Sequence, residues 1–242
     1  MSGGIAASAR DNLGQCNTVL TELDTLDQEV SNSASNLKSA DVQISALLER
    51  VSLLINEIGT AGIYTDDSPY MNASKQMAAE VTAVFEAASA RGEIAFEDFF
   101  DENYREIPGT NPKQYLTRYT ELCDRVLPAI QEKYVASLPH LQYAITSHRS
   151  GYLPTHNLKY SKPQGPDPVW NAANSRNRMK YPPRNVQKAA AVQSNESKFA
   201  SLSTIRRDLG NGRHVMMKNA SAPIFLNGKY WGYTAIGYVL PE

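Results

Sequence analysis

The N-terminal quarter of the chain repeats apolar residues with a seven-residue period, uninterrupted by proline or glycine between Gly14 and Gly59. One set of seam positions holds Cys16, Leu23, Val30, Leu37, Ile44, Val51 and Ile58, and the other holds Val19, Leu26, Ser33, Ala40, Leu47 and Leu54. This period is that of a coiled coil, and β-branched residues in one set with leucines in the other favour a parallel pair. The alternative is an amphipathic helix that packs on its own domain, but at about 1.5 Å per residue it would outreach that core. The pattern predicts a coiled-coil dimerisation helix over residues 1–60.

Helical spacing continues, in shorter segments, through residues 61–138. A helix is expected after Asp67 or Ser68, either of which can cap it, with Pro69 in its first turn and Arg91-Gly92 at its end. A short helix within 93–103 should present three phenylalanines on one side, and Pro128 should kink or divide a helix over 114–135. We expect this helical region to pack on the domain that follows.

From Leu141 the pattern changes to short alternating runs typical of β-strands. Residues 141–146 and 152–154 predict a hairpin, and strands are expected again over 201–208, 213–226 and 229–240. Asn227-Gly228 predicts a tight hairpin turn, because both residues tolerate positive φ. The fold class predicted is α+β, with a five-stranded antiparallel sheet over residues 139–242 whose first strand is central. Residues 155–198 should form short helices and loops over one face of the sheet.

Charge is distributed unevenly along the chain. Residues 1–107 hold 18 acidic and 6 basic side chains, whereas residues 148–218 hold 13 basic and 3 acidic ones. The basic residues are scattered through turns and form no recognisable nucleic-acid motif, so we expect no nucleic-acid partner. An anionic small ligand, or docking of the basic half on an acidic helical surface, explains the uneven charge equally well. No apolar run could span a membrane and no leader pattern opens the chain, so the expected location is cytoplasmic.

Several motifs resemble a known family of sensory domains. They are residues 99–104 (FFDENY), 107–110 (IPGT), 151–157 (GYLPTHN), 170–174 (WNAAN) and 221–225 (SAPIF). Together they resemble the Cache/PAS-like module of bacterial methyl-accepting chemotaxis proteins and of short relatives, from about residue 55 onward. The resemblance implies a sensory unit in chemotaxis-type signalling, with chemotaxis signalling proteins as partners, and leaves the ligand open. The long signalling hairpin of a complete receptor does not fit in this chain, so we expect either a fragment or a stand-alone sensor.

Catalytic motifs are missing from the sequence. The four histidines, His140, His148, His156 and His214, lack the spacing of a metal site, and there is no nucleophile elbow or phosphate-binding glycine pattern. Two cysteines, Cys16 and Cys123, are too few for a disulfide framework or a zinc site. We therefore expect a binding protein, not an enzyme.

The predicted ligand site lies between the sheet and the insert of residues 155–198. Its candidate residues are Tyr152, His156, Trp170, Asn174, Arg176, Arg178 and Arg206. An indole wall, an amide and guanidinium groups suit a ligand with a planar or apolar body and an anionic end.

Other interpretations of these residues stay open. Trp170 and the asparagines can simply pin the insert to the sheet, while the arginines face water or pair with acidic helices. His156 can close a loop by hydrogen bonds, contact the ligand, or serve as an axial haem ligand, because PAS-like folds can hold haem. The alternative functions are accordingly a haem-binding redox or gas sensor of the same fold and a ligand-free structural dimerisation adaptor.

Overall fold

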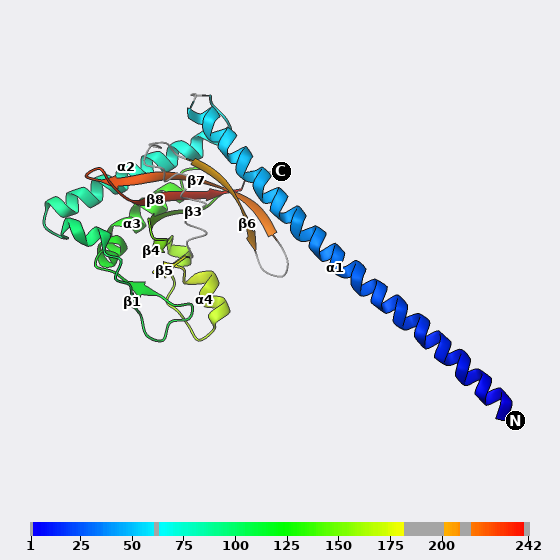
Figure 1. Cartoon of the computed structure of the whole chain (residues 1–242). Helices are drawn as coiled ribbons and strands as arrows, with labels where there is room; N and C mark the ends of the chain where they lie inside the picture. Colours follow the sequence, from blue (N-terminus) through cyan, green and yellow to red (C-terminus); the bar gives the residue numbers. More distant parts are fainter. Residues whose placement is uncertain (1, 61–62, 182–200, 209–213, 240–242) are drawn as a thin grey trace. The chain divides into compact units, whose positions relative to one another are not determined.

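The computed structural model of the chain describes residues 2–60, 63–181, 201–208 and 214–239. The chain divides into two compact units, Met1–Arg50 and Val51–Glu242. Helices and strands occur in the second unit together, so the fold is α+β (Figure 1). No helix among the described residues has the length and apolar character needed to cross a membrane.

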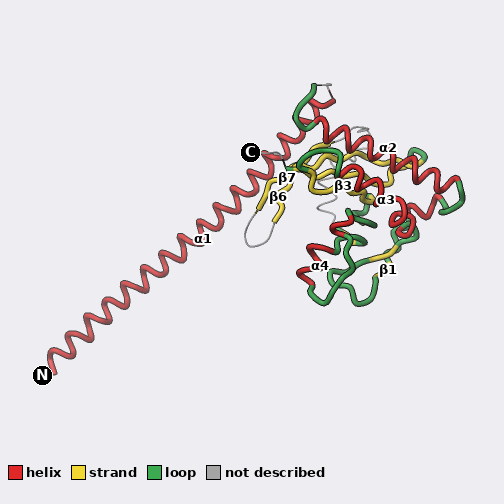
Figure 2. The backbone as a smooth tube through the Cα atoms, turned by 180° about the vertical axis from the view of Figure 1, so that it is seen from behind, coloured by secondary structure: helices red, strands yellow, loops and turns green. Residues whose placement is uncertain are grey.

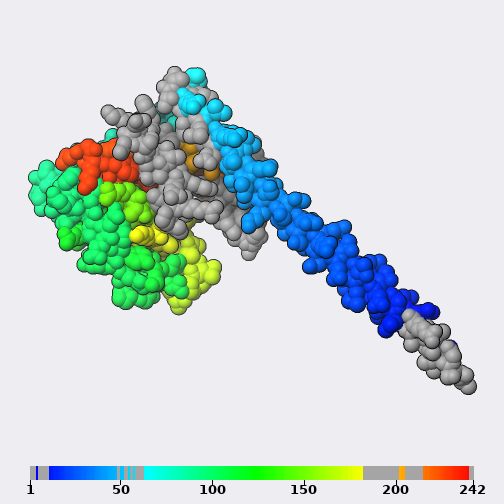
Figure 3. All heavy atoms as spheres, in the orientation of Figure 1, coloured from blue at the N-terminus to red at the C-terminus, as the bar shows by residue number. Residues whose placement is uncertain are grey.

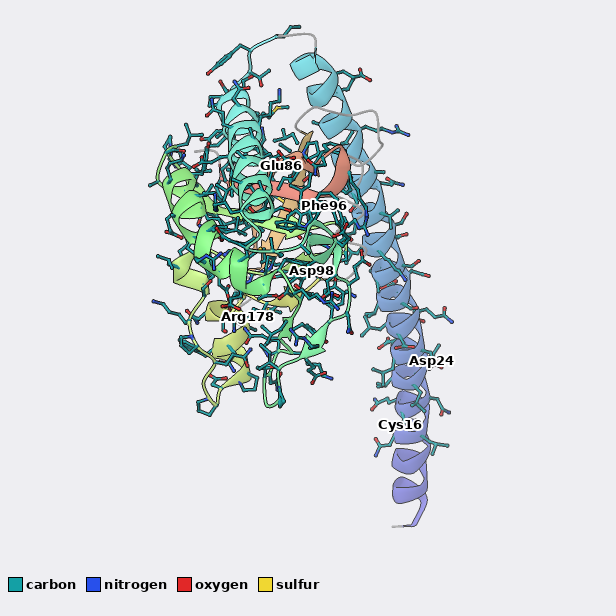
Figure 4. The ribbon with its side chains drawn as sticks, turned by 90° about the vertical axis from the view of Figure 1, so that its left-hand side faces the viewer. Cys16, Asp24, Glu86, Phe96, Asp98 and Arg178 are labelled. Carbon is teal, nitrogen blue, oxygen red and sulfur yellow. The ribbon has the colours of Figure 1, made fainter. Side chains whose placement is uncertain are left out.

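Helix α1 spans Ser2–Thr60 without interruption. Its described seam leucines, isoleucines and valines are solvent-exposed in the single chain, from 42% at Val51 to 72% at Leu37. Cys16 is exposed as well, and Figure 4 labels it on α1 together with Asp24. The predicted helix is therefore present, while its pairing as a coiled coil stays a prediction.

The helices of the second unit follow the predicted pattern with shifted boundaries. Helix α2 spans Ser68–Ala90 with Asp67 at its N-cap, η1 spans Phe96–Phe100, and α3 spans Thr120–Val135 with Pro128 inside it. Helix α3 begins six residues later than the expected residue 114, because β2 (Tyr115–Leu116) pairs with β1 (Arg105–Glu106). Asp67 caps α2 through its carbonyl alone, and its carboxylate binds the sheet instead.

The sheet is antiparallel and consists of β3 (Leu141–His148), β6 (Ser201–Asp208), β7 (His214–Leu226) and β8 (Lys229–Tyr238), in the order β3-β8-β7-β6. The hairpin between β7 and β8 is confirmed, with φ of 47° at Asn227 and 78° at Gly228. Between β3 and β6 the described chain forms β4 (Tyr152–Leu153), η2 (Leu158–Tyr160), α4 (Pro168–Asn174) and β5 (Met179–Lys180). Residues 182–198 of the expected insert lie outside the described part.

The prediction of five strands with the first one central is wrong. The sheet has four strands, β3 lies at its edge, and β4 pairs with β5 in a separate two-stranded ladder. Side chains occupy the position expected for the fifth strand: Asn157 Oδ1 accepts the Ala144 N–H at the free edge of β3 (2.9 Å). Asn157 is fully buried there, so its amide satisfies a backbone group that a strand would otherwise pair.

One hydrophobic core joins the helices to the sheet. Helix α2 packs on β7 and β8, and α3 packs on β3, as the tube drawing also shows for α2 (Figure 2). Trp231 is fully buried at the centre of this core, with Phe85 and Tyr119 edge-on at 5.1 and 5.8 Å, and its Nε1 donates to the Phe99 carbonyl (2.8 Å). The helical region and the strands therefore share one core.

Candidate functional site

The two faces of the sheet differ in chemistry. Register places Ala144, Ile236, Ala220 and Leu202 in one cross-strand row, on the face that α2 and α3 cover. The neighbouring rows point to the opposite side, because side chains alternate along a strand. Those rows consist of Tyr143, Gly237, Asn219 and Ser203; of Ile145, Ala235 and Ser221; and of Ser147, Tyr233 and Pro223. We call this second set the polar face.

The polar face is buried as well as polar. Ser147, Asn219 and Ser221 are only 3%, 9% and 2% exposed. Tyr143 donates its hydroxyl proton to Asn219 Oδ1 (3.0 Å), and Asn219 Nδ2 donates to Ser221 Oγ (2.9 Å). One amide and two hydroxyls are thus hydrogen-bonded over β8, from β3 to β7, on a face with no charged side chain in its three rows.

Glycine at position 237 makes this arrangement possible. A Cβ atom there would lie 2.3 Å from the Tyr143 ring, far inside contact distance, so the ring lies over the backbone of β8. The row at the other end of the face contains Ser147 and Tyr233, where burial raises the pKa of the Tyr233 phenol against the opposing effect of the Ser147 hydroxyl. The face therefore carries a tyrosine near each end.

Two of the predicted residues, Tyr152 and Arg178, support the fold. Tyr152 is fully buried, and its hydroxyl donates to the Tyr115 carbonyl (2.8 Å) beside Thr120 Oγ1 (2.9 Å). Arg178 pairs through Nη2 with Asp124 of α3 (2.5 Å), and Figure 4 labels it beside that helix. These contacts match the interpretation in which an arginine pairs with an acidic helix.

His156 and Arg176 meet at Tyr160. The imidazole is 4% exposed, accepts the Asn157 N–H at Nδ1 (2.7 Å) and lies edge-on to the Tyr160 ring at 4.7 Å. The Arg176 guanidinium lies over the same ring at 5.9 Å. His156 also contacts Tyr143 edge-on at 6.2 Å, which places it at the border of the polar face.

The remaining candidates lie elsewhere. Trp170 is 44% exposed on α4, and its carbonyl accepts a hydrogen bond from Asn174 Nδ2 (2.9 Å). Arg206 lies on β6 opposite Met216, and its side chain falls outside the described part. The described candidates thus form three groups, around Tyr152, around Tyr160 and on α4.

Sequence reasoning missed the polar face itself. The signal was the alternation within the strands, since Tyr143, Ile145 and Ser147 share one side of β3 while Asn219 and Ser221 share one side of β7. Most of the predicted candidates belong to the long insert, whereas the buried polar groups Ser147, Asn219 and Ser221 lie on strands.

Other features of the surface are less suited to the predicted ligand. One pocket of about 330 Å³ is lined by Glu86, Phe96 and neighbours at the end of α2, labelled in Figure 4. A second, of about 250 Å³, lies between α2 and β7. Neither includes a predicted site residue. Within the described ranges, no group of three or more His, Cys, Asp or Glu side chains could hold a metal ion.

Comparison with known proteins adds no identification. A scan against models of protein families finds no match to the chain. A search of curated proteins finds no related sequence either. The link to Cache/PAS-like modules consequently remains a resemblance carried by the motifs.

Proposed function

We propose that the chain is a cytoplasmic sensory unit of chemotaxis-type signal transduction, which binds a small molecule on the polar face and passes its state to a dimeric coiled coil. The observation that carries the proposal is the hydrogen-bonded network in which the half-buried Tyr143 binds the buried Asn219, which in turn binds the buried Ser221. Buried polar groups contribute little to stability and are costly when unpaired, so a sheet face built from them favours a recognition role. The absence of charge from its three rows suits an uncharged planar body, and an anionic end would need a cation beyond those rows.

A second arrangement supports transmission of the signal. Lys218 and Asn219 are consecutive on β7, and their partners Tyr238 and Gly237 are consecutive on β8. On the helix side, Lys218 Nζ binds both oxygens of Asp67 (3.0 and 2.8 Å), and the Tyr238 hydroxyl donates to the same carboxylate (2.8 Å).

Asp67 in turn holds the start of α2. Its carbonyl accepts the N–H groups of Tyr70 and Met71, and the Tyr70 ring stacks on Tyr238 at 3.7 Å. A shift of β7 or β8 at Asn219 or Gly237 would therefore move the first turn of α2, which follows α1 along the chain.

Ligand binding is tested by thermal unfolding of the full chain in the presence of small carboxylic acids, amino acids and purines. A ligand at 100 times its Kd raises the free energy of unfolding by about 2.7 kcal/mol. Each compound that raises Tm is then measured with Tyr143→Phe, which removes only the hydroxyl that binds Asn219. Tyr70→Phe is the matched control, because its hydroxyl binds the Pro139 carbonyl on the α2 side. Loss of the shift in Tyr143→Phe alone supports the polar face.

The alternatives give different results. Equal Tm shifts in both variants would move the site away from the polar face. A purified protein with visible haem absorbance that His156→Ala abolishes would favour the haem sensor. No Tm shift with any compound, together with a stable dimer, would favour the structural adaptor.

Dimerisation through α1 is tested separately. Leu47→Asp with Leu54→Asp would bury like charges across a parallel seam, at a cost of several kcal/mol. Both leucines are exposed in the single chain, at 60% and 58%, so a monomer would tolerate the change. Light scattering is expected to report a dimer for the wild type and a monomer for the double variant; a double variant that remains dimeric would refute the seam.

A further inference from the structure

One group of exposed apolar side chains lies on η2 and α4, at the end of the second unit that lies away from α2 (Figure 1). From residue 65 onward, the described large apolar side chains with high exposure are Leu158 (58%), Val169 (80%), Trp170 (44%) and Met216 (48%). Three of the four belong to η2 and α4, which contact each other. Figure 3 shows α4 in yellow-green at the lower edge of the second unit, where its atoms form open surface. We call Leu158, Val169 and Trp170, with the neighbouring cations Lys159, Lys162 and Arg176, the α4 patch.

The backbone beneath the patch is held by buried polar side chains. Asn171, 2% exposed, donates through Nδ2 to the carbonyls of Asn111 and Gly165 (2.9 Å each) and accepts the Gly165 N–H (2.8 Å). Asp167 caps α4 by accepting the Val169 N–H (2.9 Å). Val169 and Trp170 are thus exposed on a short helix whose ends are held by other residues. A preorganised aromatic side chain of this kind loses little entropy on binding a partner.

The cations of the patch make no ion pair within the described residues, whereas eight other lysines and arginines do. Lys159 and Arg176 lie over the Tyr160 ring, at 4.8 and 5.9 Å, and the Lys162 N–H donates to the Asn174 carbonyl (3.0 Å). Two acids in this region, Asp167 and Glu132, accept backbone N–H groups of Val169 and Leu158. The positive charge of the patch is thus open to an outside partner.

We propose that the α4 patch is a docking surface for an acidic segment of a partner protein. An apolar side chain of that segment packs against Trp170 and Val169, and its carboxylates face Lys159, Lys162 and Arg176. Tryptophan at the centre of a contact with charges at its rim is the usual composition of an interaction hot spot, in which the centre supplies affinity and the rim supplies selectivity. The proposal is independent of ligand binding on the polar face.

Intrinsic fluorescence gives a direct test, because the chain has two tryptophans and Trp231 is fully buried. The full chain is titrated with a synthetic amphipathic helical peptide whose leucine stripe is flanked by glutamates. The matched control peptide replaces every glutamate by lysine. We expect a saturable blue shift with the glutamate peptide that weakens as salt rises and is absent in Trp170→Phe.

Charge is tested by the double variant Lys159→Glu with Lys162→Glu, which changes exposed side chains. Affinity for the glutamate peptide should fall at least about 10-fold, with Tm unchanged. No saturable shift with the glutamate peptide, or equal binding of the lysine peptide, would overturn the proposal. A shift that persists in Trp170→Phe would also overturn it, as would one that only anionic lipid vesicles produce.

Discussion

The two faces of the sheet use the same strands for different purposes. On the α2 side, rows of Ala, Ile and Leu pack around Trp231 into the core that holds the second unit together. On the other side, the same strands bury Ser147, Asn219 and Ser221. Apolar residues of similar shape could replace such hydrogen-bonded groups at little cost in stability. If the polar face binds a small molecule as proposed, its residues serve recognition, whereas the residues of the α2 side serve the core. Variants of the two faces should therefore differ in kind as well as in size.

The largest effect is expected on the α2 side, from Trp231→Ala. Removing a fully buried indole leaves a cavity and deprives the Phe99 carbonyl of its donor, at a cost of about 3–5 kcal/mol. Urea denaturation followed by circular dichroism measures the loss. Trp170→Ala is the matched control and should change stability by less than about 0.5 kcal/mol, because that side chain is exposed. Equal losses in the two variants would contradict the assignment of the core.

Features set by neighbouring residues in the sequence could be predicted, whereas features set by contacts between distant residues could not. The helices, the Asn227-Gly228 hairpin and strand 201–208 follow from local periodicity and turn chemistry, and they are present. The order of strands depends on which groups reach the free edge of β3, and an asparagine 13 residues away does so. No local pattern specifies such a contact, so the predicted central position of that strand was wrong.

The candidate site shows the same limit. Arg178 is a strong anion-binding candidate by residue type, but its pairing with Asp124 is a long-range contact. His156 follows the short strand β4 closely in the sequence, and its ring centroid lies 6.2 Å from that of Tyr143 on β3, whereas its role in binding stays a prediction. No sequence motif marks Asn219, and its contact with Tyr143 follows only from the register of both residues with Gly237.

The second effect is pH-dependent and arises from His148, on the α2 side opposite Gly232. Burial, assisted by Arg149 and Lys180, lowers the pKa of its imidazole from 6.5 to about 3. The unfolded chain therefore binds a proton that the folded chain does not, so this residue's contribution is complete above about pH 6.5 and declines as pH falls toward 3. Between pH 7 and pH 4 the loss is roughly 3 kcal/mol.

His148→Gln removes this titration, and comparing variants cancels the effect of the carboxylates. Urea midpoints measured across this pH range should fall less steeply for His148→Gln than for the wild type. Parallel pH profiles would show that the imidazole can be protonated in the folded protein.

The third effect is expected from Lys218→Met, on the α2 side directly beside Asn219 of the polar face. The change leaves the Asp67 carboxylate, whose side chain is 5% exposed, with the Tyr238 hydroxyl and without its cation. We expect a loss of about 2 kcal/mol, less than for a fully buried pair because the Lys218 side chain is 29% exposed. Adding Asp67→Asn should recover part of it, since no unpaired charge then remains buried. Hydrogen exchange at the Tyr70 and Met71 amides reports the start of α2, and unchanged protection there would argue against transmission through this pair.

The smallest effect separates stability from recognition and uses Tyr143→Phe. The ring can still lie over Gly237 while the hydroxyl bond to Asn219 is lost, so the free energy of unfolding should fall by about 1 kcal/mol. Tyr70→Phe removes one hydroxyl bond on the α2 side and should cost a similar amount or less, because its 3.2 Å bond to Pro139 is longer and partly exposed. The two variants should thus be nearly indistinguishable in urea, yet only Tyr143→Phe should diminish the Tm shift that a bound small molecule produces. If Tyr70→Phe diminishes the shift equally, the polar face has no special role in binding and its hydrogen bonds serve the fold alone.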